Sequence, residues 1–341
     1  MSALLSFTLF STFGLHEHFS RDWEDYDSYQ SGSHSETEDN ESSSPTVLTP
    51  STDSSARPTD TDAKPLSASD GAVYLAALRS RNVASCPKDI LWQGQLKDLH
   101  TGYADQPGSS DLYSRSLIHA KAVRDRYWNE HTFHQVTPFF LTEWLVGMSS
   151  LRFCVDSPWA VEHLPCSAFD APVLRAPRPR VTIGLQSFHF LTGKVLRDLQ
   201  PYIAPIECDQ ALAFPFVAVE IAPEGSVLGA RQNLYNAAVM LRNLRFLWER
   251  THFDAKGFDR IIRALTVTIS RNVVEVYGHW TVYENGEVLY MHAKMHSWWL
   301  TDKNEDWYRA RCGLEECCWW MAGKSEAWIP ESMKVLKETA V

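Results

Sequence analysis

The sequence contains no run of apolar residues as long as the ~18–20 that a membrane-spanning helix requires. It also lacks the phosphate-binding pattern GxxxxGK[ST], a GxGxxG pattern after a strand, and the GxSxG pattern of serine hydrolases. These absences argue against membrane proteins, P-loop enzymes, dinucleotide-binding enzymes and hydrolases with a nucleophilic serine. We therefore expect a soluble protein with no membrane partner.

Basic residues are fewer than acidic ones, 32 Lys and Arg against 42 Asp and Glu. The excess of acid belongs to Met1–Lys64, where 12 acidic residues face 3 basic ones. This segment is rich in Ser, Thr and Pro, and it has too little apolar surface to offset the entropy of folding. We predict a disordered acidic tail over residues 1–69, a helical extension over 70–130 and a folded domain over 131–341. The near-neutral domain leaves the partner open, either protein or nucleic acid.

The seven cysteines are odd in number and include no CxxC pair, which argues against a zinc site or a disulfide framework. Buried thiols in a reducing compartment are the simpler interpretation, and they favour an intracellular protein of the cytoplasm or nucleus. Met1–Leu15 is apolar, but it has no basic residue before its apolar run and no clear cleavage site. A signal peptide therefore stays open as an alternative.

Hydrophobic periodicity predicts the elements of the folded part. Helices are predicted at residues 72–81, 112–128 and 227–250, near Thr137, and at 332–338. Strands are predicted at 181–185, 214–221, 265–270, 273–280 and 287–295, with a hairpin turn at Glu284–Gly286 between the last two. This order predicts an α/β (α+β) domain with a mixed β-sheet flanked by helices, followed by a tryptophan-rich C-terminal segment.

The strand predicted at Phe214–Ile221 carries the clearest functional signal, because it is apolar almost throughout and delivers one acid, Glu220, at its end. Together with RPRVTIGL (178–185) and the helix ARQNLYNAAVML (230–241), the segment FPFVAVEIAPEG (214–225) resembles a group of fungal proteins of unknown function. Their core looks like the PD-(D/E)xK, restriction-endonuclease-like nuclease fold. The resemblance implies an Asp at the start of one strand and a Glu at the end of the next that hold Mg²⁺. It also implies a Lys two residues after the Glu, beside the attacking water.

Carried over residue by residue, the resemblance leaves this metal site incomplete. Glu220 matches the Glu, but Ala222 stands at the Lys position and Arg180 at the Asp position. Because a guanidinium repels a divalent ion, we expect Arg180 to pair with Glu220 and the site to be catalytically disabled. Glu143, on the short helix predicted near Thr137, is a candidate for an additional acid.

The expected function is a non-catalytic binding or interaction module without a cofactor. Two alternatives remain open. One is a divergent Mg²⁺-dependent nuclease that uses Glu220 with partners relocated to Glu207, Asp209, Glu224, Lys194 or Arg231. The other is a secreted, effector-like protein. His292 and His296 are four residues apart and are predicted to share one face, but they lack the HExxH pattern of a zinc site.

Overall fold

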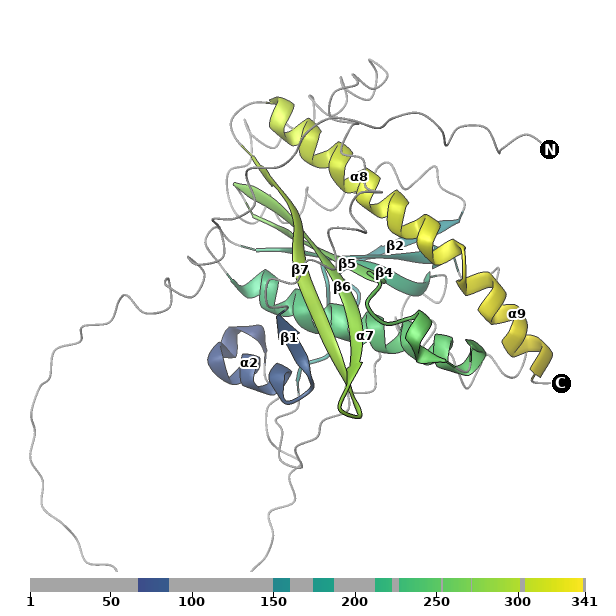
Figure 1. Cartoon of the computed structure of the whole chain (residues 1–341). Coiled ribbons are helices and arrows are strands. Elements are labelled where there is room, and N and C mark those ends of the chain that lie inside the picture. The colour runs from purple at the N-terminus through teal and green to yellow at the C-terminus, as the bar shows by residue number, and fades with distance from the viewer. Residues whose placement is uncertain are drawn as a thin grey trace, which may run out of the picture. The chain divides into compact units, whose positions relative to one another are not determined.

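The computed structural model of the chain describes residues 67–85, 150–159, 174–186, 212–222, 227–252, 254–270, 272–300 and 304–339 (Figure 1). The chain divides into two units, residues 1–60 and 61–341, and every described residue belongs to the second. The tail predicted over 1–69 therefore lies outside the described residues, except for 67–69. The helices predicted at 112–128 and near Thr137 also lie outside them.

Within these ranges, seven strands form one mixed sheet in the order β1–β7–β6–β5–β4–β3–β2. The strands are β1 Val83–Ser85, β2 Leu151–Val155, β3 Val181–Gln186, β4 Leu212–Ile221, β5 Ala264–Ile269, β6 Val273–Glu284 and β7 Glu287–Trp299. Neighbouring strands are antiparallel, except for the parallel pairs β4/β5 and β1/β7. The mixed sheet is as predicted, and the structure adds β1 and β2, which the sequence did not predict.

Helices pack on both faces of this sheet (Figure 1). The helix α7, Leu228–His252, lies on β4 and β5, and α8, Asn304–Glu326, crosses β7 with Gly313 against the ring of Trp298. The remaining helices of the described chain are η1 Ala68–Asp70, α2 Ala72–Arg79, η5 Ala255–Gly257 and α9 Ile329–Thr339. Among the described residues, no helix has the length and apolarity needed to cross a membrane.

The two faces of the sheet differ in polarity, because successive residues of a strand point to opposite sides. On one face, β4 and β5 contribute Val217, Val219, Val267 and other apolar side chains that are almost fully buried. On the face covered by α7, the paired residues are Glu220 and Thr268. The face of the sheet under α7 therefore carries a buried polar pair, Glu220 and Thr268, which is a candidate for a functional site.

The central strand β4 contains Pro215, which has no N–H to donate to a neighbouring strand. The structure accommodates it in an irregularity of the β3/β4 ladder opposite Gly184, next to Phe214 with φ 50°. A Cβ on Gly184 would lie 2.6 Å from the carbonyl oxygen of Ala213, so the close approach of β3 to β4 requires glycine there.

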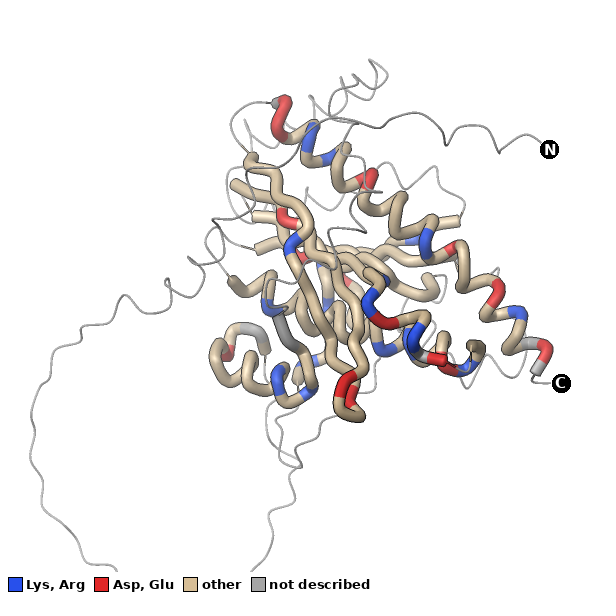
Figure 2. Tube along the Cα trace, in the orientation of Figure 1, with Lys and Arg blue, Asp and Glu red and all other residues tan. Residues whose placement is uncertain are grey.

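The hairpin of β6 and β7 turns at Asn285 and Gly286, which have φ values of 53° and 86°, as the Glu284–Gly286 signal predicted. Figure 2 shows acidic positions at this hairpin tip, while most of the strands carry no charge. Charged residues gather instead on helices and turns, as expected for strands that form the core.

Candidate functional site

Glu220 is the second-last residue of β4, and its side chain lies under α7 with only 6% of the residue exposed. Asn236 of α7 donates from Nδ2 to Glu220 Oε1 at 2.8 Å. One turn earlier, Asn233 donates to Thr268 Oγ1 and to the Val267 carbonyl, both at 2.9 Å. These bonds connect the ends of two parallel strands to a single helix.

The two asparagines occupy the buried side of α7 because positions three apart lie on one face of a helix. Asn233 and Asn236 are each 2% exposed and stand among apolar neighbours such as Ala237 and Leu241. These two asparagines were not among the predicted site residues. The sequence nevertheless indicates them, because amide side chains within the apolar stripe of a helix need polar partners on the element against which the helix packs.

Burial raises the pKa of Glu220 to about 8. The Asn236 hydrogen bond lowers this pKa, the negative charge of Asp156 raises it, and the positive charge of Arg180 lowers it. Because loss of water dominates these contributions, Glu220 is mostly a neutral acid at pH 7. A neutral carboxyl group is a hydrogen-bonding group and a poor ligand for Mg²⁺.

Arg180 pairs with Asp156, and the predicted pairing with Glu220 is wrong. Arg180 Nη1 donates to Asp156 Oδ2 at 2.5 Å, and the Asp156 N–H donates to the Arg180 carbonyl at 3.1 Å. The side chain of Asp156 is 38% exposed, whereas Glu220 is buried. Pairing with Asp156 therefore leaves the guanidinium partly hydrated, which avoids the cost of burying it beside Glu220.

Ala222, at the position that the resemblance assigns to lysine, is 3% exposed and packed against the start of α7. Its N–H donates to the carbonyl of Ile269 at 2.9 Å. A Cβ added to Gly229 would lie 3.0 Å from the Ala222 Cβ. The close contact between β4 and α7 leaves no room here for a long cationic side chain.

The described residues do not fit a Mg²⁺ ion, which needs several converging oxygen ligands. Among them, no group of three His, Cys, Asp or Glu side chains is placed to hold a metal. Glu220 faces an amide N–H donor, and Asp156 is bonded to a guanidinium. Several candidates from the sequence lie outside the described residues, namely Glu143, Lys194, Glu207, Asp209 and Glu224.

Two further polar residues, Tyr74 and Tyr235, are buried in this part of the molecule. Burial raises the pKa of Tyr74 in α2, and the nearby Tyr235 and Glu220 raise it further. Burial also raises the pKa of Tyr235 in α7, which the charge of Arg81 lowers. Among the described residues, the Tyr235 hydroxyl is buried without a hydrogen-bond partner. We name Glu220, Asn233, Asn236 and Thr268 the Glu220 cluster, and the charge of Glu220 affects Tyr74 of a segment that precedes β2 in sequence.

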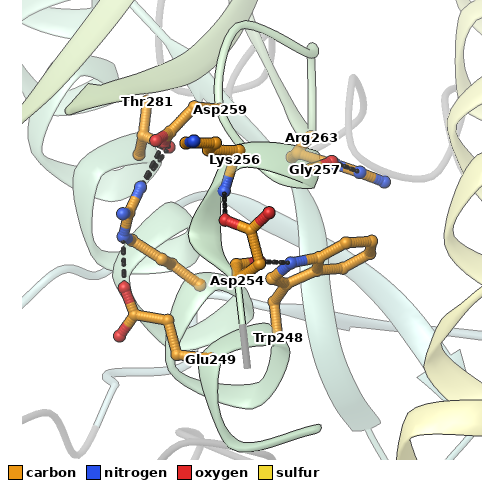
Figure 3. A network of polar contacts seen from close by, with 9 residues as sticks. Trp248, Glu249, Asp254, Lys256, Gly257, Asp259, Arg263 and Thr281 are labelled. Atoms are coloured by element: carbon orange, nitrogen blue, oxygen red, sulfur yellow. Dashed lines mark hydrogen bonds and ion pairs between the residues drawn. The ribbon is translucent and has the colours of Figure 1, made fainter. Parts of the chain in front are cut away.

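A second polar cluster ties the end of α7 to β6 (Figure 3). Arg245 donates to Glu249 at 2.7 Å, to Thr281 at 3.1 Å and to Asp259, and Thr281 donates to Asp259 at 2.6 Å. Every group here has a partner inside the cluster, which is typical of a structural rather than a catalytic network.

Beside this cluster, Arg263 donates to the Gly257 carbonyl at 2.9 Å (Figure 3). Its guanidinium lies 5.1–5.4 Å from the ring centres of Trp248, Phe258 and Trp328. Burial lowers the pKa of Arg263 to about 10. An aromatic cage that already holds a cation of its own chain is a structural element, because its binding position is filled.

The histidines of β6 and β7 do not form a metal site in the described chain. A bulge between Val276 and Tyr277 in the β6/β7 register puts His292 opposite His279 and His296 opposite Val276. His292 and His296 therefore point to opposite faces, and the prediction that they share one face is wrong. His279 is buried against Thr266 at 2.7 Å, and burial lowers its pKa well below the usual value.

Comparison with known families matches residues 146–329 to a sequence profile described as a domain of unknown function, DUF7924. No curated protein matches the chain. The matched range contains β2 to β7, α7 and α8, and it leaves out residues 67–85. Because the description assigns no activity, the geometry of the Glu220 cluster has to carry the functional conclusion.

Proposed function

This chain belongs to the DUF7924 family, and we propose that it is a non-catalytic binding module on a nuclease-like sheet. Glu220, which the resemblance matches to the metal-binding Glu, is a buried, hydrogen-bonded residue that joins β4 to α7. The arrangement of β3 antiparallel to β4, followed by α7 and the parallel strand β5, supports the resemblance to the PD-(D/E)xK core.

The observation that carries the proposal is the environment of Glu220. Its carboxyl group is bonded to Asn236, the residue is 6% exposed, and burial raises its pKa to about 8. A metal-dependent nuclease needs a charged carboxylate that is open to the ion and to the phosphate. A neutral carboxyl group under a helix supports a structural role in place of catalysis.

To test whether the protein lacks nuclease activity, the full chain is incubated with DNA or RNA in the presence of Mg²⁺ or Mn²⁺. We expect the substrates to remain intact with the wild-type protein and with Glu220→Gln. Cleavage by the wild-type protein that disappears in Glu220→Gln would show that Glu220 serves a working active site.

The surface around Asp156 supports an anionic partner. Residues 150–159 and 174–186 contain four arginines and one acid, and three of these arginines are exposed: Arg152, Arg175 and Arg178. Arg152 lies on the edge strand β2, and Arg178 Nε donates to the carbonyl of Asp156, directly after that strand, at 3.0 Å. Clustered arginines bind phosphate or carboxylate groups through several N–H donors each.

Binding is tested with fluorescent DNA, RNA and polyglutamate over a range of salt concentrations. We expect at least one of these polyanions to bind, with an affinity that falls as salt rises. Replacing Arg175 and Arg178 with Ala should weaken binding and flatten the salt dependence by about one unit of slope for each arginine that binds a phosphate. Lys334→Ala, on an exposed side chain of α9, is the matched control. A failure to bind any of the three polyanions contradicts an anionic partner.

The second candidate function is a divergent Mg²⁺-dependent nuclease that uses Glu220 with relocated partners. The observation in its favour is that Asp156 lies close enough for its charge to raise the pKa of Glu220, so two carboxyl groups share this end of the sheet. Calorimetric titration with Mg²⁺ and Mn²⁺ separates the two functions. Heat of binding that vanishes in both Glu220→Gln and Asp156→Asn would favour the nuclease.

We place the protein inside the cell, in the cytoplasm or nucleus, rather than among secreted effectors. Among the described residues, three cysteines are buried free thiols, namely Cys312, Cys317 and Cys318. Free buried thiols support a reducing compartment. Cell fractionation with an antibody tests the placement, and accumulation of the protein in the culture medium would contradict it.

A further inference from the structure

Residues 67–85, here named the latch segment, precede the matched family range and are separated from Ser150 by residues 86–149. The segment comprises η1, α2 and β1. It inserts Tyr74, Ala77, Leu78 and Val83 into the core, each at most 6% exposed. A part of the chain outside the family domain thus completes its core.

The latch segment is held at two places. Its strand β1 adds in parallel to the edge of β7 through three residue pairs, Val83 with Tyr290 to Ser85 with His292. The Tyr290 N–H donates to the Asn82 carbonyl at 2.8 Å. Its helix α2 turns the buried side chains of Tyr74, Ala77 and Leu78 toward the core. Pro87 follows two residues after β1 in the sequence and has no N–H with which to continue the pairing.

This hold is weak compared with the rest of the sheet. The helix α2 has eight residues, and helices shorter than ~12–15 residues are marginal on their own. By contrast, β6 and β7 pair over their whole length. The order of the latch segment therefore depends on docking, and the segment can undock without unfolding the sheet.

Docking also leaves a polar group unsatisfied. The Tyr235 hydroxyl of α7 is buried without a hydrogen-bond partner among the described residues. Tyr74 of the latch segment is also buried, and the charge of Tyr235 contributes to its raised pKa. A buried hydroxyl without a hydrogen bond opposes the closed state, because in the open state water can bond to it. The unsatisfied Tyr235 hydroxyl therefore favours opening of the latch segment.

We propose that residues 67–85 form a reversible latch that docks on α7 and the β7 edge and covers the Tyr235 hydroxyl. The latch goes beyond the proposed binding function, because it concerns how this part of α7 is covered and not what the domain binds. Its test measures local opening, so a failure of the latch leaves the binding and cleavage experiments unaffected.

The test is amide hydrogen exchange on the full chain. We expect amides of α2 and the Tyr290 amide to exchange at least about tenfold faster than those of β5, because they open locally. Leu78→Asp should abolish the remaining protection of the latch segment and of Tyr290 while β5 stays protected. Val73→Asp is the matched control, since Val73 lies on the same helix and is 54% exposed, and it should change nothing.

The substitution Tyr235→Phe should stabilise the docked latch segment, whereas Leu78→Asp should release it. It removes the unsatisfied hydroxyl while keeping the ring, so it should slow exchange in the latch segment by about fivefold or more. Three results would overturn the proposal. They are exchange of α2 at the same rate as β5, loss of protection in β5 together with the latch segment in Leu78→Asp, and unchanged exchange in Tyr235→Phe.

Discussion

Glu220 is the residue on which the distinction between a nuclease and a binding module depends. A charged carboxylate at this place is a metal ligand, whereas a neutral one bonded to Asn236 joins a strand to a helix. Burial favours the neutral form. The charge state of one side chain therefore has consequences for stability that can be measured without knowing the partner.

The first prediction concerns the pH dependence of stability. The pKa of Glu220 is about 8 in the folded chain and near 4.5 when exposed, so folding holds a proton that the unfolded chain releases between these values. The contribution is fully present below pH 4.5 and is lost as pH rises toward 8. The free energy of unfolding should fall by up to about 1.4 kcal/mol per pH unit in this window.

Urea unfolding from pH 5 to pH 8 measures this slope. In Glu220→Gln the slope should be smaller by this amount, because the amide does not titrate. Glu331→Gln, at a side chain that is 68% exposed, should keep the wild-type slope. Equal slopes in the wild-type protein and Glu220→Gln would contradict a raised pKa.

The second prediction concerns the lysine position. Ala222→Lys places a long cation where Gly229 and α7 leave no room. We expect the free energy of unfolding to fall by about 3 kcal/mol or more, from overpacking and an unpaired buried charge. Thermal or urea unfolding measures the change, with Ala222→Ser as a small-residue control. A variant that keeps wild-type stability and gains Mg²⁺-dependent cleavage would mean that the site accepts the missing lysine.

At the residue scale, the sequence predicted the position of Glu220 and the absence of the lysine, but not the partners. The strand-end acid follows from local pattern, since an apolar run that stops at a carboxylate is visible in the chain itself. Asn236 and Asp156 approach Glu220 only through tertiary packing of α7 and β2, which no local pattern encodes. For the same reason, Arg180 was assigned to Glu220 and not to Asp156.

At the element scale, α7 carries two polar clusters, one near each end of the helix, and they bond to different strands. Near its start, Asn233 and Asn236 bond to β4 and β5, and near its end Arg245 bonds to β6 and the preceding turn. Long elements with a clear period, such as α7 and β4, were predicted correctly. The short strands β1 and β2 were missed because VAS and LRFCV lack the closely spaced β-branched residues that predicted a strand at 181–185.

The third prediction uses the two acids that bind Arg245. The side chain of Asp259 is 12% exposed and that of Glu249 is 48% exposed. Asp259→Ala removes the buried partner and should cost about 3 kcal/mol, because it leaves a guanidinium without its buried counter-charge. Glu249→Ala should cost less than about 1 kcal/mol, since exposed pairs contribute little. Equal effects of the two substitutions in urea unfolding would contradict this ranking.

At the scale of the whole molecule, the described fold extends beyond the matched family range at both ends. The latch segment lies before residue 146, and α9 continues past residue 329. The sequence could not predict these contacts, because they join segments far apart along the chain. The pairing of β1 with β7 is an example, since it brings Val83 beside Tyr290.

The fourth prediction tests the C-terminal extension. Deleting residues 329–341 removes Ile329 and Met333, both at most 1% exposed, and the hydrogen bond between Ser332 and Thr251. We expect the free energy of unfolding to fall by more than about 3 kcal/mol, because two large apolar side chains leave the core. A chain ending at Thr339 is the control. Unchanged stability of the shorter chain would show that the family range is complete without α9.

The ionisation of Glu220 itself separates a binding module from a nuclease, and carbon-13 NMR of the glutamate carboxyl groups measures it, with the signal assigned through Glu220→Gln. We expect a midpoint near pH 8 that does not move when Mg²⁺ is added. A midpoint below pH 5, or one that Mg²⁺ shifts downward, would show a charged, metal-binding carboxylate and contradict the binding-module assignment.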